Sequence, residues 1–311
     1  MASQASSVRF DPEVLRRRWI QVPTDNPSAA EEAEHFSGVD FAAAGGQAWE
    51  TDSFAYLPVV VNFRLGETVA RETIVFALNG DRVITLQPQS HFLVFDTAIA
   101  RMRRNPQLAH SSYGVMYALL YALNEASEQV IDYASDTLES MNDTIQLATS
   151  GYDDRGKEMG VADMQDAIAR MNDTEEIVSR TQESQLLLAR AARHLRTEVP
   201  AEATDLGTLT DILISDIDGV KEHAGFEHDK VRYLQQSIMT SLEIKQNQIV
   251  KVFTIITAVF LPPTLIATFY GMNFTFMPEL QWEHGFLATT LLTLIVALIP
   301  LVYIKRKGWL R

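Results

Sequence analysis

Residues 252–270 read VFTIITAVFLPPTLIATFY, nineteen residues without a charged side chain. A second uncharged run of nineteen, FLATTLLTLIVALIPLVYI, covers residues 286–304. At ~1.5 Å of rise per residue, each run would form a helix of roughly 29 Å, close to the thickness of a bilayer's hydrocarbon core. Two such runs at one end of a chain, separated by a short polar loop, predict two transmembrane helices rather than buried core helices.

The charge of the chain divides at the same place. Residues 245–311 carry six Lys or Arg and two Glu, a balance of +4, whereas the whole chain of 311 residues has a net charge of -14. The first 244 residues therefore carry -18. This excess of acids favours cationic partners and argues against a nucleic-acid binder, which needs a basic face. Because the chain has no cysteine, disulfides, thiolate metal sites and thiol nucleophiles are excluded.

Loop charges give the expected orientation of the two spans. Lys245 and Lys251 precede the first run, a basic run at 305–307 follows the second, and the connection 271–285 has no Lys or Arg. By the positive-inside rule, both termini face the cytoplasm. The first residues have no apolar stretch after their charges, so we expect neither a signal peptide nor a transit peptide.

The N-terminal region is expected to form a cytoplasmic α/β domain. It reads as three strands: 54–63, 72–78 and 82–86. Asn79-Gly80, between the last two, predicts a hairpin with a type I′ turn, which needs positive φ at both central positions. The region has no glycine-rich phosphate loop and no nucleophile grouping with familiar spacing, so we do not expect an enzyme.

Beyond residue 106 the pattern becomes helical. Proline is absent until Pro200, and apolar residues recur at intervals of three and four, which predicts two long helices that separate near Gly151. Between residues 125 and 183 this hairpin carries fifteen acids and four bases. A solvated helix face explains such an excess, and the alternative is a field that concentrates cations near a pore mouth.

A third helical pattern begins near residue 205 and continues without proline to Leu261, into the first uncharged run. It predicts one helix of about 55 residues or more, roughly 80 Å long, with a cytoplasmic and an intramembrane half. A helix of this length needs partners. The simplest partners are copies of itself around a common axis.

The first span carries a stripe of polar and apolar side chains at intervals of three and four. Its members are Asn247, Val250, Thr254, Thr257, Leu261, Thr264 and Thr268. Threonine hydroxyls often bond back to their own helix in membranes, and this explanation stays open for each of them. A ring of such helices would form a narrow, uncharged pore that suits hydrated cations. Pro262-Pro263 either kinks the helix or leaves carbonyls facing pore water, and the two effects are compatible.

The first span ends in Tyr270-Gly271-Met272-Asn273-Phe274, and a Met-Pro-Glu-Leu loop at 277–280 follows. Together with Leu-Pro-Pro-Thr-Leu-Ile at 261–266 and the closing Lys-Arg-Lys-Gly-Trp-Leu at 305–310, this resembles the CorA-type magnesium transport proteins. Their hallmark is a Gly-Met-Asn triplet that ends the first of two C-terminal spans. The motifs cover residues 245–311, and the rest of the chain agrees with the family in layout.

The resemblance implies an α+β membrane protein that assembles into a funnel-shaped homopentamer in the inner or plasma membrane, with the lipid bilayer and copies of itself as partners. It implies a Mg²⁺-selective channel that also passes Co²⁺ and Ni²⁺. Transport would be passive, driven by the membrane potential, and would stop when intracellular Mg²⁺ binds between cytoplasmic domains. The expected division of the chain is a cytoplasmic α/β domain (1–106), an acidic helical hairpin (107–204), a stalk helix (205–251), a first span (252–270), an external loop (271–285), a second span (286–304) and a basic tail (305–311).

The resemblance also assigns roles to single residues. Gly271, Met272 and Asn273 would form the selectivity filter, and Glu279 would raise the local cation concentration. Asn247 and Thr264 would form polar pore rings; Val250, Phe253 and Leu261 would form apolar constrictions; Thr257 and Thr268 would line the same pore. The run Lys305, Arg306 and Lys307 would form a positive collar at the membrane surface.

Regulatory metal ligands are expected among the acids of the stalk, with a partner in the α/β domain across a subunit boundary. The candidates are Asp96, Asp211, Asp216, Asp218 and Glu222. Hard oxygen ligands suit Mg²⁺, and an ion would relieve the repulsion between carboxylates of two chains. The mixture of His and acids at 222–229 also resembles a transition-metal site, although a solvated helix surface is the preferred explanation.

Two alternatives remain open from sequence. One is a proton-coupled Zn²⁺ transporter of the same superfamily, although neither span contains Asp, Glu or His. The other is a membrane-anchored coiled-coil scaffold whose spans serve only as tethers. A scaffold would not require a threonine stripe, a double proline and a Gly-Met-Asn triplet.

Overall fold

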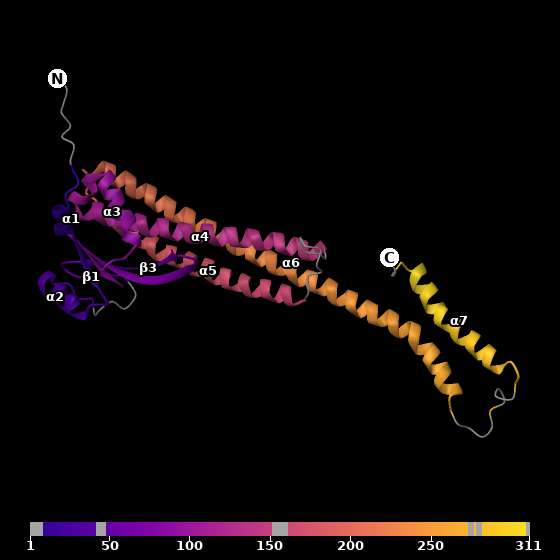
Figure 1. Ribbon diagram of the computed structural model, residues 1–311. Coiled ribbons are helices and arrows are strands. Elements are labelled where there is room, and N and C mark those ends of the chain that lie inside the picture. Colours follow the sequence, from indigo (N-terminus) through magenta and orange to yellow (C-terminus); the bar gives the residue numbers. More distant parts are fainter. Residues whose placement is uncertain (1–8, 42–47, 151–160, 273–276, 278–281, 309–311) are drawn as a thin grey trace. The chain divides into compact units, whose positions relative to one another are not determined.

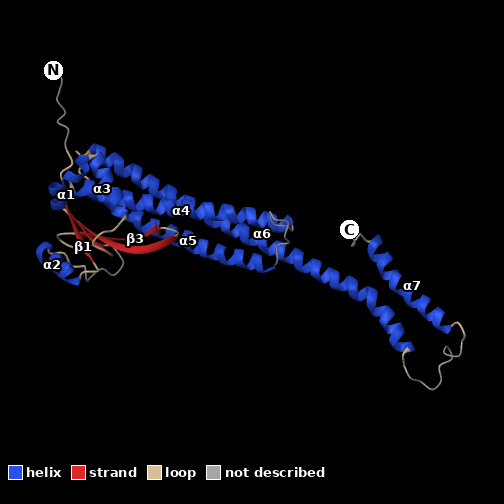
Figure 2. Cartoon of the chain, viewed as in Figure 1, coloured by secondary structure: helices blue, strands red, loops and turns tan. Residues whose placement is uncertain are grey.

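The computed structural model describes residues 9–41, 48–150, 161–272, 277 and 282–308. The chain forms two compact units, residues 1–236 and residues 237–311, and each is considered by itself. Strands occur only in the first unit, among the described residues (Figure 2).

The first unit contains a five-stranded sheet in the order β1-β5-β4-β3-β2 (Figure 1). Its strands are β1 (Trp19–Pro23), β2 (Trp49–Glu50), β3 (Ala55–Leu65), β4 (Thr68–Leu78) and β5 (Val83–Gln87). β1 pairs parallel to β5, and every other pair is antiparallel. The three predicted strands correspond to β3, β4 and β5, whereas β1 and β2 were not predicted.

The two hairpins use different turns. Between β3 and β4 the chain turns through two residues, and Gly66 has φ of 66°, as a two-residue hairpin requires at its first central position. The Asn79-Gly80 hairpin between β4 and β5 is also present, but the predicted type I′ turn is wrong. Neither residue has positive φ, because the Asn79 side chain closes a wider turn by accepting the backbone N–H groups of Asp81 and Arg82 at 2.9 and 2.8 Å.

The helices are α1 (Pro12–Arg18), α2 (Pro27–Ser37), α3 (Val94–Arg104), a 3₁₀ helix (Pro106–His110), α4 (Ser112–Ser150), α5 (Val161–Glu198), α6 (Thr204–Tyr270) and α7 (Gly285–Arg306). α4 and α5 form the predicted helical hairpin, and α6 is the predicted long helix. Its 67 residues correspond to roughly 100 Å at ~1.5 Å per residue.

The sheet buries both faces, because its strands alternate between two apolar clusters. On one face, residues such as Val59, Ile74 and Phe76 pack with α4 and α5 in the main core. On the other face, Tyr56 and Ile84 pack with the segment that follows α2. The sheet therefore supports the N-terminal half of α4 and the C-terminal half of α5.

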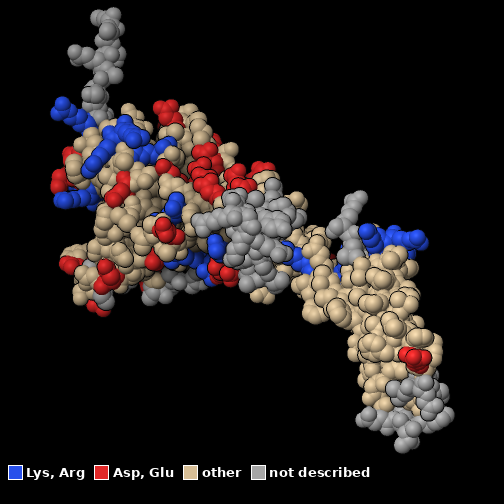
Figure 3. All heavy atoms as spheres, turned by 45° about the vertical axis from the view of Figure 1, so that its right-hand side comes forward, with Lys and Arg blue, Asp and Glu red and all other residues tan. Residues whose placement is uncertain are grey.

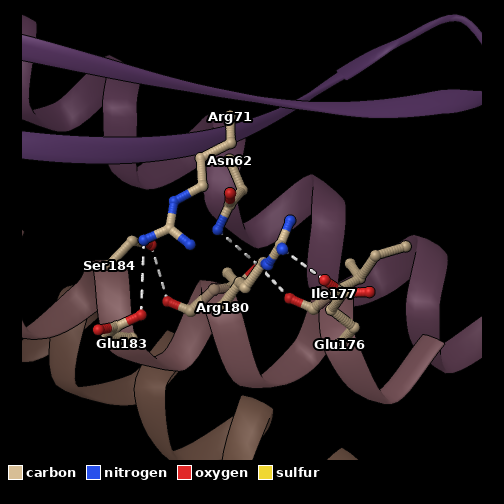
Figure 4. A network of polar contacts seen from close by, with 8 residues as sticks. Asn62, Arg71, Glu176, Ile177, Arg180, Glu183 and Ser184 are labelled. Carbon is tan, nitrogen blue, oxygen red and sulfur yellow. Dashed lines mark hydrogen bonds and ion pairs between the residues drawn. The ribbon is translucent and has the colours of Figure 1, made fainter. Parts of the chain in front are cut away.

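Polar contacts also join the sheet to α5 (Figure 4). Asn62 of β3, only 2% exposed, donates from Nδ2 to Thr181 Oγ1 at 3.2 Å. The Thr181 hydroxyl in turn donates to the Ile177 carbonyl at 2.8 Å. At the surface, Arg71 of β4 forms an ion pair with Glu183 at 3.4 Å. The buried pair fixes the register of α5 on the sheet, since an unpaired amide there would cost free energy.

Within the first unit, α6 packs on α4 and α5 through one apolar stripe. Leu213 and Ile217 join the main core, and Val220 and Ala224 join a second cluster with residues of α4 and α5. The spacing of three and four keeps these side chains on one face of the helix. The opposite face of this part of α6 is left exposed.

The second unit consists of the rest of α6 and α7. Both helices contain segments long and apolar enough to cross a membrane, and almost nothing in these segments is buried within the chain. Pro262 and Pro263 lie inside α6 without ending it, and Pro300 lies inside α7. Apolar helices that the chain itself leaves uncovered need lipid or another subunit around them.

Candidate functional site

The stripe on the first span lies on one side of α6. A spacing of seven residues turns a position by only about 20° around an α-helix, so Asn247, Thr254, Leu261 and Thr268 stay within about 60° of one another. Val250, Thr257 and Thr264 lie to one side of this row, and all seven members stay within an arc of about 100°. Val250 and Leu261 are exposed by 61% and 65% in the single chain, so their side chains are free to line a path.

The hydroxyls of the stripe are fixed by their own helix. Thr254, Thr257 and Thr264 donate to the carbonyls of Val250, Phe253 and Phe260 at 2.8, 2.8 and 2.7 Å, and Thr268 donates to the Thr264 carbonyl. The back-bonded arrangement considered above is therefore present at all four positions. Each hydroxyl donates its only proton to a carbonyl of its own helix. The lone pairs of its oxygen remain available to accept a hydrogen bond from outside the helix.

This arrangement suits a hydrated cation. The waters around a cation point their hydrogens outward, so a wall that contacts them should offer acceptors rather than donors. Threonine hydroxyls that already donate to their own helix present only acceptors to these waters, and they carry no charge. Phe253, 67% exposed, lies at the edge of the stripe, where the family resemblance expects an apolar constriction.

The stripe leads to the C-terminal end of α6. Gly271 N–H donates to the Ala267 carbonyl at 2.9 Å, and Met272 N–H approaches the Phe269 carbonyl at 3.4 Å. A Cβ at Gly271 would lie 3.1 Å from the Ala267 carbonyl oxygen, so a side chain there would crowd the helix end. The C-terminal end of a helix carries a partial negative charge, which favours a cation. Asn273 and Glu279 lie outside the described residues.

The other end of the apolar unit is basic. α7 finishes with Lys305 and Arg306, Lys307 follows it, and Gly308 closes the helix with φ of 74°. Figure 3 shows the apolar helices as an almost uncharged surface, with Lys and Arg at the C-terminal end of α7. Cations at a helix C-terminus stabilise it and, next to an apolar span, are typical of the cytoplasmic interface.

The five acids expected to bind a regulatory ion are not brought together within one chain. Two of them form ion pairs, Asp211 with Arg196 at 2.7 Å and Asp218 with Arg193 at 3.3 Å, and Asp96 lies 3.4 Å from the His91 ring nitrogen Nε2. Asp216 borders a cavity, and Glu222 is exposed. In the part of the chain that the structure describes, no three Asp, Glu or His side chains are placed to hold one metal ion.

The His and acid residues at 222–229 also divide between different partners. His223 pairs with Glu227 at 3.6 Å, whereas His228 points to Glu175 of α5 at 3.4 Å. Glu227 is 1% exposed and accepts from the Ser135 hydroxyl of α4 at 3.0 Å. These side chains join the helices of the bundle and do not form a transition-metal site.

Sequence reasoning missed the cavity that Asp216 borders. It lies between α4 and α6 within the first unit, and Glu125 and Glu128 of α4 line it as well. Burial, and then the charges of Asp132, Asp216 and Glu125, raise the pKa of the Glu128 carboxyl above its ordinary value. The acid excess of the hairpin was visible in the sequence, but its approach to α6 depends on tertiary packing.

Comparisons with known proteins agree on one family. The model of the family described as "CorA-like Mg2+ transporter protein" matches residues 13–306. The magnesium transport protein CorA of Yersinia pseudotuberculosis is 32% identical over 240 residues, which cover 76% of this chain and 72% of that protein.

Two solved structures show a similar fold. The complete structure of the CorA magnesium transporter from Methanocaldococcus jannaschii aligns with a TM-score of 0.73 at 15% identity, over 98% of this chain and 94% of that one. The cytoplasmic domain of ZntB from Vibrio parahaemolyticus aligns with a TM-score of 0.51 at 13% identity, over 72% of this chain and 87% of that one. At these identities the two likenesses support the predicted fold class and say nothing of the transported ion.

Proposed function

The chain belongs to the family of CorA-like Mg²⁺ transporter proteins, and we propose that it forms a Mg²⁺-selective channel that admits the ion to the cytoplasm. Like the other members of its family, it is a divalent cation transporter and not an enzyme. Co²⁺ and Ni²⁺ would pass by the same path. The observation that carries the proposal is the continuous helix α6, which bears the threonine stripe and ends at Tyr270, directly before Gly271.

The ion would pass as a hydrated cation along the stripe. Asn247, Thr257, Thr264 and Thr268 would accept hydrogen bonds from its water shell, and Val250, Phe253 and Leu261 would narrow the path between the polar rings. This division is supported by the four back-bonded hydroxyls and by the lack of charged side chains in the span. Mg²⁺ gives up its waters reluctantly, so a wall that keeps the shell intact lowers the barrier to passage.

Selection would occur at the outer end of α6. Gly271 and Met272 would bring the backbone close to the ion, and the Asn273 side-chain carbonyl would contact its water shell. Glu279 would attract cations to the mouth. Support comes from the Gly-Met-Asn motif and from the negative end of the helix at Gly271.

The channel would be a homopentamer in the inner membrane, with both termini in the cytoplasm. In the first unit, Ile212, Phe226 and Tyr233 expose 51%, 65% and 69% of their surfaces on α6, at spacings of fourteen and seven residues. A heptad spacing of exposed apolar residues on a long helix is typical of helices that pack against copies of themselves. Lys305, Arg306 and Lys307 would form the collar on the cytoplasmic side.

Mg²⁺ in the cytoplasm would close the channel. Asp96, Asp211, Asp216, Asp218 and Glu222 are the proposed ligands, drawn from adjacent subunits. All five are exposed in the single chain, which leaves them accessible to a neighbouring subunit. Without a bound ion, repulsion between the carboxylates of adjacent subunits would disfavour the closed arrangement. Binding of Mg²⁺ would relieve this repulsion and stabilise the closed arrangement.

No energy source other than the ion's own gradient would be required. At ~2.3 kcal/mol per charge per 100 mV, a divalent cation that enters a negative-inside cell gains about 4.6 kcal/mol per 100 mV. The alternative with Zn²⁺ and a proton gradient would need a titratable group to carry the proton. Neither uncharged run, 252–270 or 286–304, contains one of Asp, Glu or His.

Ion flux into liposomes tests the proposal. The protein would be reconstituted as wild type and as Asn273→Ala, and uptake of Mg²⁺, Co²⁺ and Zn²⁺ measured with and without a proton gradient. We expect Mg²⁺ uptake that needs no proton gradient, stops with Mg²⁺ on the cytoplasmic side and is impaired by the substitution. Proton-dependent Zn²⁺ uptake without Mg²⁺ uptake would contradict the proposal in favour of the zinc alternative.

A further inference from the structure

A cavity of about 400 Å³ lies in the first unit between α3, α4 and the beginning of α6. Thr97, Arg101 and Arg104 of α3 line it, at spacings of four and three residues, so they share one face of this helix. Another face of α3, with Ala98 and Met102, is fully buried in the main core. The core therefore fixes the helix that presents the two arginines to the cavity.

Two tyrosines of α4 hold the guanidinium of Arg101 in one orientation. Its Cζ lies 3.5 Å from the centroid of the Tyr121 ring, and its Nη2 donates to the Tyr117 hydroxyl at 2.7 Å. Tyr117 is only 2% exposed, so the core fixes this tyrosine as well. A planar guanidinium held in this way presents its remaining N–H groups as a rigid fork, which is the geometry that binds oxyanions.

The two arginines have no carboxylate partner. Within the part of the chain that the structure describes, no Asp or Glu lies within 4.0 Å of either guanidinium, whereas Arg193 and Arg196 of α5 both pair with acids of α6. Glu125 is the one acid among the described residues that line the cavity. Two arginines and one glutamate leave the cavity with a charge of +1, although the first 244 residues carry -18. The cavity is therefore a positive site in an acidic region, which favours an anion.

The pair of arginines favours a phosphate group over a carboxylate. A phosphate monoester carries a charge of about -1.5 to -2 and three acceptor oxygens, which match two guanidinium forks better than a single carboxylate charge does. Thr97 and Asn105 add neutral donors to the lining. The volume of about 400 Å³ falls within the range of ~300–1,000 Å³ that is typical of sites for small organic ligands.

We infer that this cavity binds a small organic phosphate ester, whose phosphate Arg101 and Arg104 hold and whose organic part lies against Leu108 and Leu209. The carboxylate of Glu125 is an acceptor for a hydroxyl or amino group of the organic part. The ligand would contact three helices of the first unit, α6 among them. It differs from the transported cation, so the inference does not rest on the proposed function.

The test is equilibrium dialysis of the full chain in a non-ionic detergent. The probes are adenosine monophosphate, phenyl phosphate and inorganic phosphate, in a buffer freed of divalent cations so that Mg²⁺ complexes of the phosphates do not contribute. We expect each ester to saturate one site per chain, and at least one ester to bind more tightly than inorganic phosphate.

The variant is Arg104→Gln, because Arg104 is exposed and its loss breaks no ion pair among the described residues. The matched control is Arg103→Gln, which removes the same charge from an exposed neighbour that lies near the Phe10 ring and does not line the cavity. At an ionic strength of ~0.15 M, we expect Arg104→Gln to weaken ester binding about tenfold or more and Arg103→Gln by less than about a factor of two. Arg101→Lys keeps the charge but loses the fork, so it should weaken binding by a factor similar to that of Arg104→Gln.

Equal weakening by Arg103→Gln and Arg104→Gln would overturn the inference, because it would indicate a diffuse basic surface at the end of α3. A wild type that binds neither ester would overturn it as well, and would leave the arginines to stabilise the C-terminal end of the helix. Equal affinity for inorganic phosphate and both esters would overturn the assignment of an organic ligand. Circular dichroism of each variant checks that the first unit is folded.

Discussion

The two units of this chain use apolar side chains in opposite ways. In the first unit the apolar stripe of α6 is covered by α4 and α5, and Ile217 is fully buried. In the second unit, Leu265 of the same helix is 70% exposed and the spans bury almost nothing within the chain. The first unit thus completes a core of its own, whereas the apolar segments of the second are left uncovered by the chain. Substitutions should therefore affect stability in the first unit and transport in the second.

The largest expected effect is a loss of stability at a buried position of the first unit. Ile217→Ala should lower the free energy of unfolding of the first unit by about 2–5 kcal/mol, because the substitution removes buried methyl groups and leaves a cavity. Leu265→Ala should leave that free energy unchanged. Denaturant unfolding of the full chain in detergent, followed by far-ultraviolet circular dichroism, gives both values. Equal destabilisation by the two variants would contradict the division into units.

The next effect concerns transport. Asn273→Ala should reduce Mg²⁺ uptake by about 10- to 100-fold, because it removes a hydrogen bond to a charged species worth ~1.5–3 kcal/mol. The unfolding of the first unit should stay as in the wild type. Uptake into liposomes and circular dichroism on the same sample check both statements. A variant that transports normally would refute a filter at this position.

A smaller effect distinguishes the two spans. Thr264 and Thr290 are exposed and donate to carbonyls of their own helices at 2.7 and 2.8 Å, but only Thr264 belongs to the stripe. Thr264→Val should lower Mg²⁺ uptake by about 2- to 10-fold, for a lost acceptor worth ~0.5–1.5 kcal/mol. Thr290→Val should change it by less than a factor of two. The opposite order of effects would place the path along α7.

The smallest effect is expected at a surface ion pair of the first unit. Arg71→Gln should change the free energy of unfolding by about 0.5 kcal/mol or less, because both partners of the Arg71–Glu183 pair are partly solvated. Asn62→Ala, which leaves the buried contact to Thr181 unmade, should cost more, about 1–3 kcal/mol. Denaturant midpoints of the two variants give the comparison. A larger loss in Arg71→Gln would show that the surface, and not burial, holds α5 on the sheet.

The sequence predicted those features of the fold that are determined by local patterns of residues. The two apolar runs, the long helix and the helical hairpin depend on periodicity over tens of residues, and all are present. The strand β1 was missed because it has only five residues and pairs with β5, more than sixty residues further along the chain. The wrong turn at Asn79 has a local cause, since its side chain replaces the positive backbone angles that the pattern favours.

The candidate site likewise has features that one stretch of sequence predicts and features that depend on tertiary packing. The stripe of α6 was readable because it follows one helix, and the Gly-Met-Asn triplet because it is contiguous. The cavity that Asp216 borders was not readable, because it depends on α4 and α6 meeting at residues about ninety positions apart. The ion pairs of Asp211 and Asp218 likewise depend on how α6 lies against α5.

The most direct test of the central claim uses the absence of cysteine from the chain. Single cysteines at Thr264 and at its neighbour Leu265 would be reconstituted in liposomes and treated with a charged, water-soluble thiol reagent while Mg²⁺ uptake is recorded. If α6 lines the pore with its stripe, the reagent blocks uptake through Thr264→Cys and leaves Leu265→Cys active. Block at Leu265→Cys but not at Thr264→Cys would contradict the account.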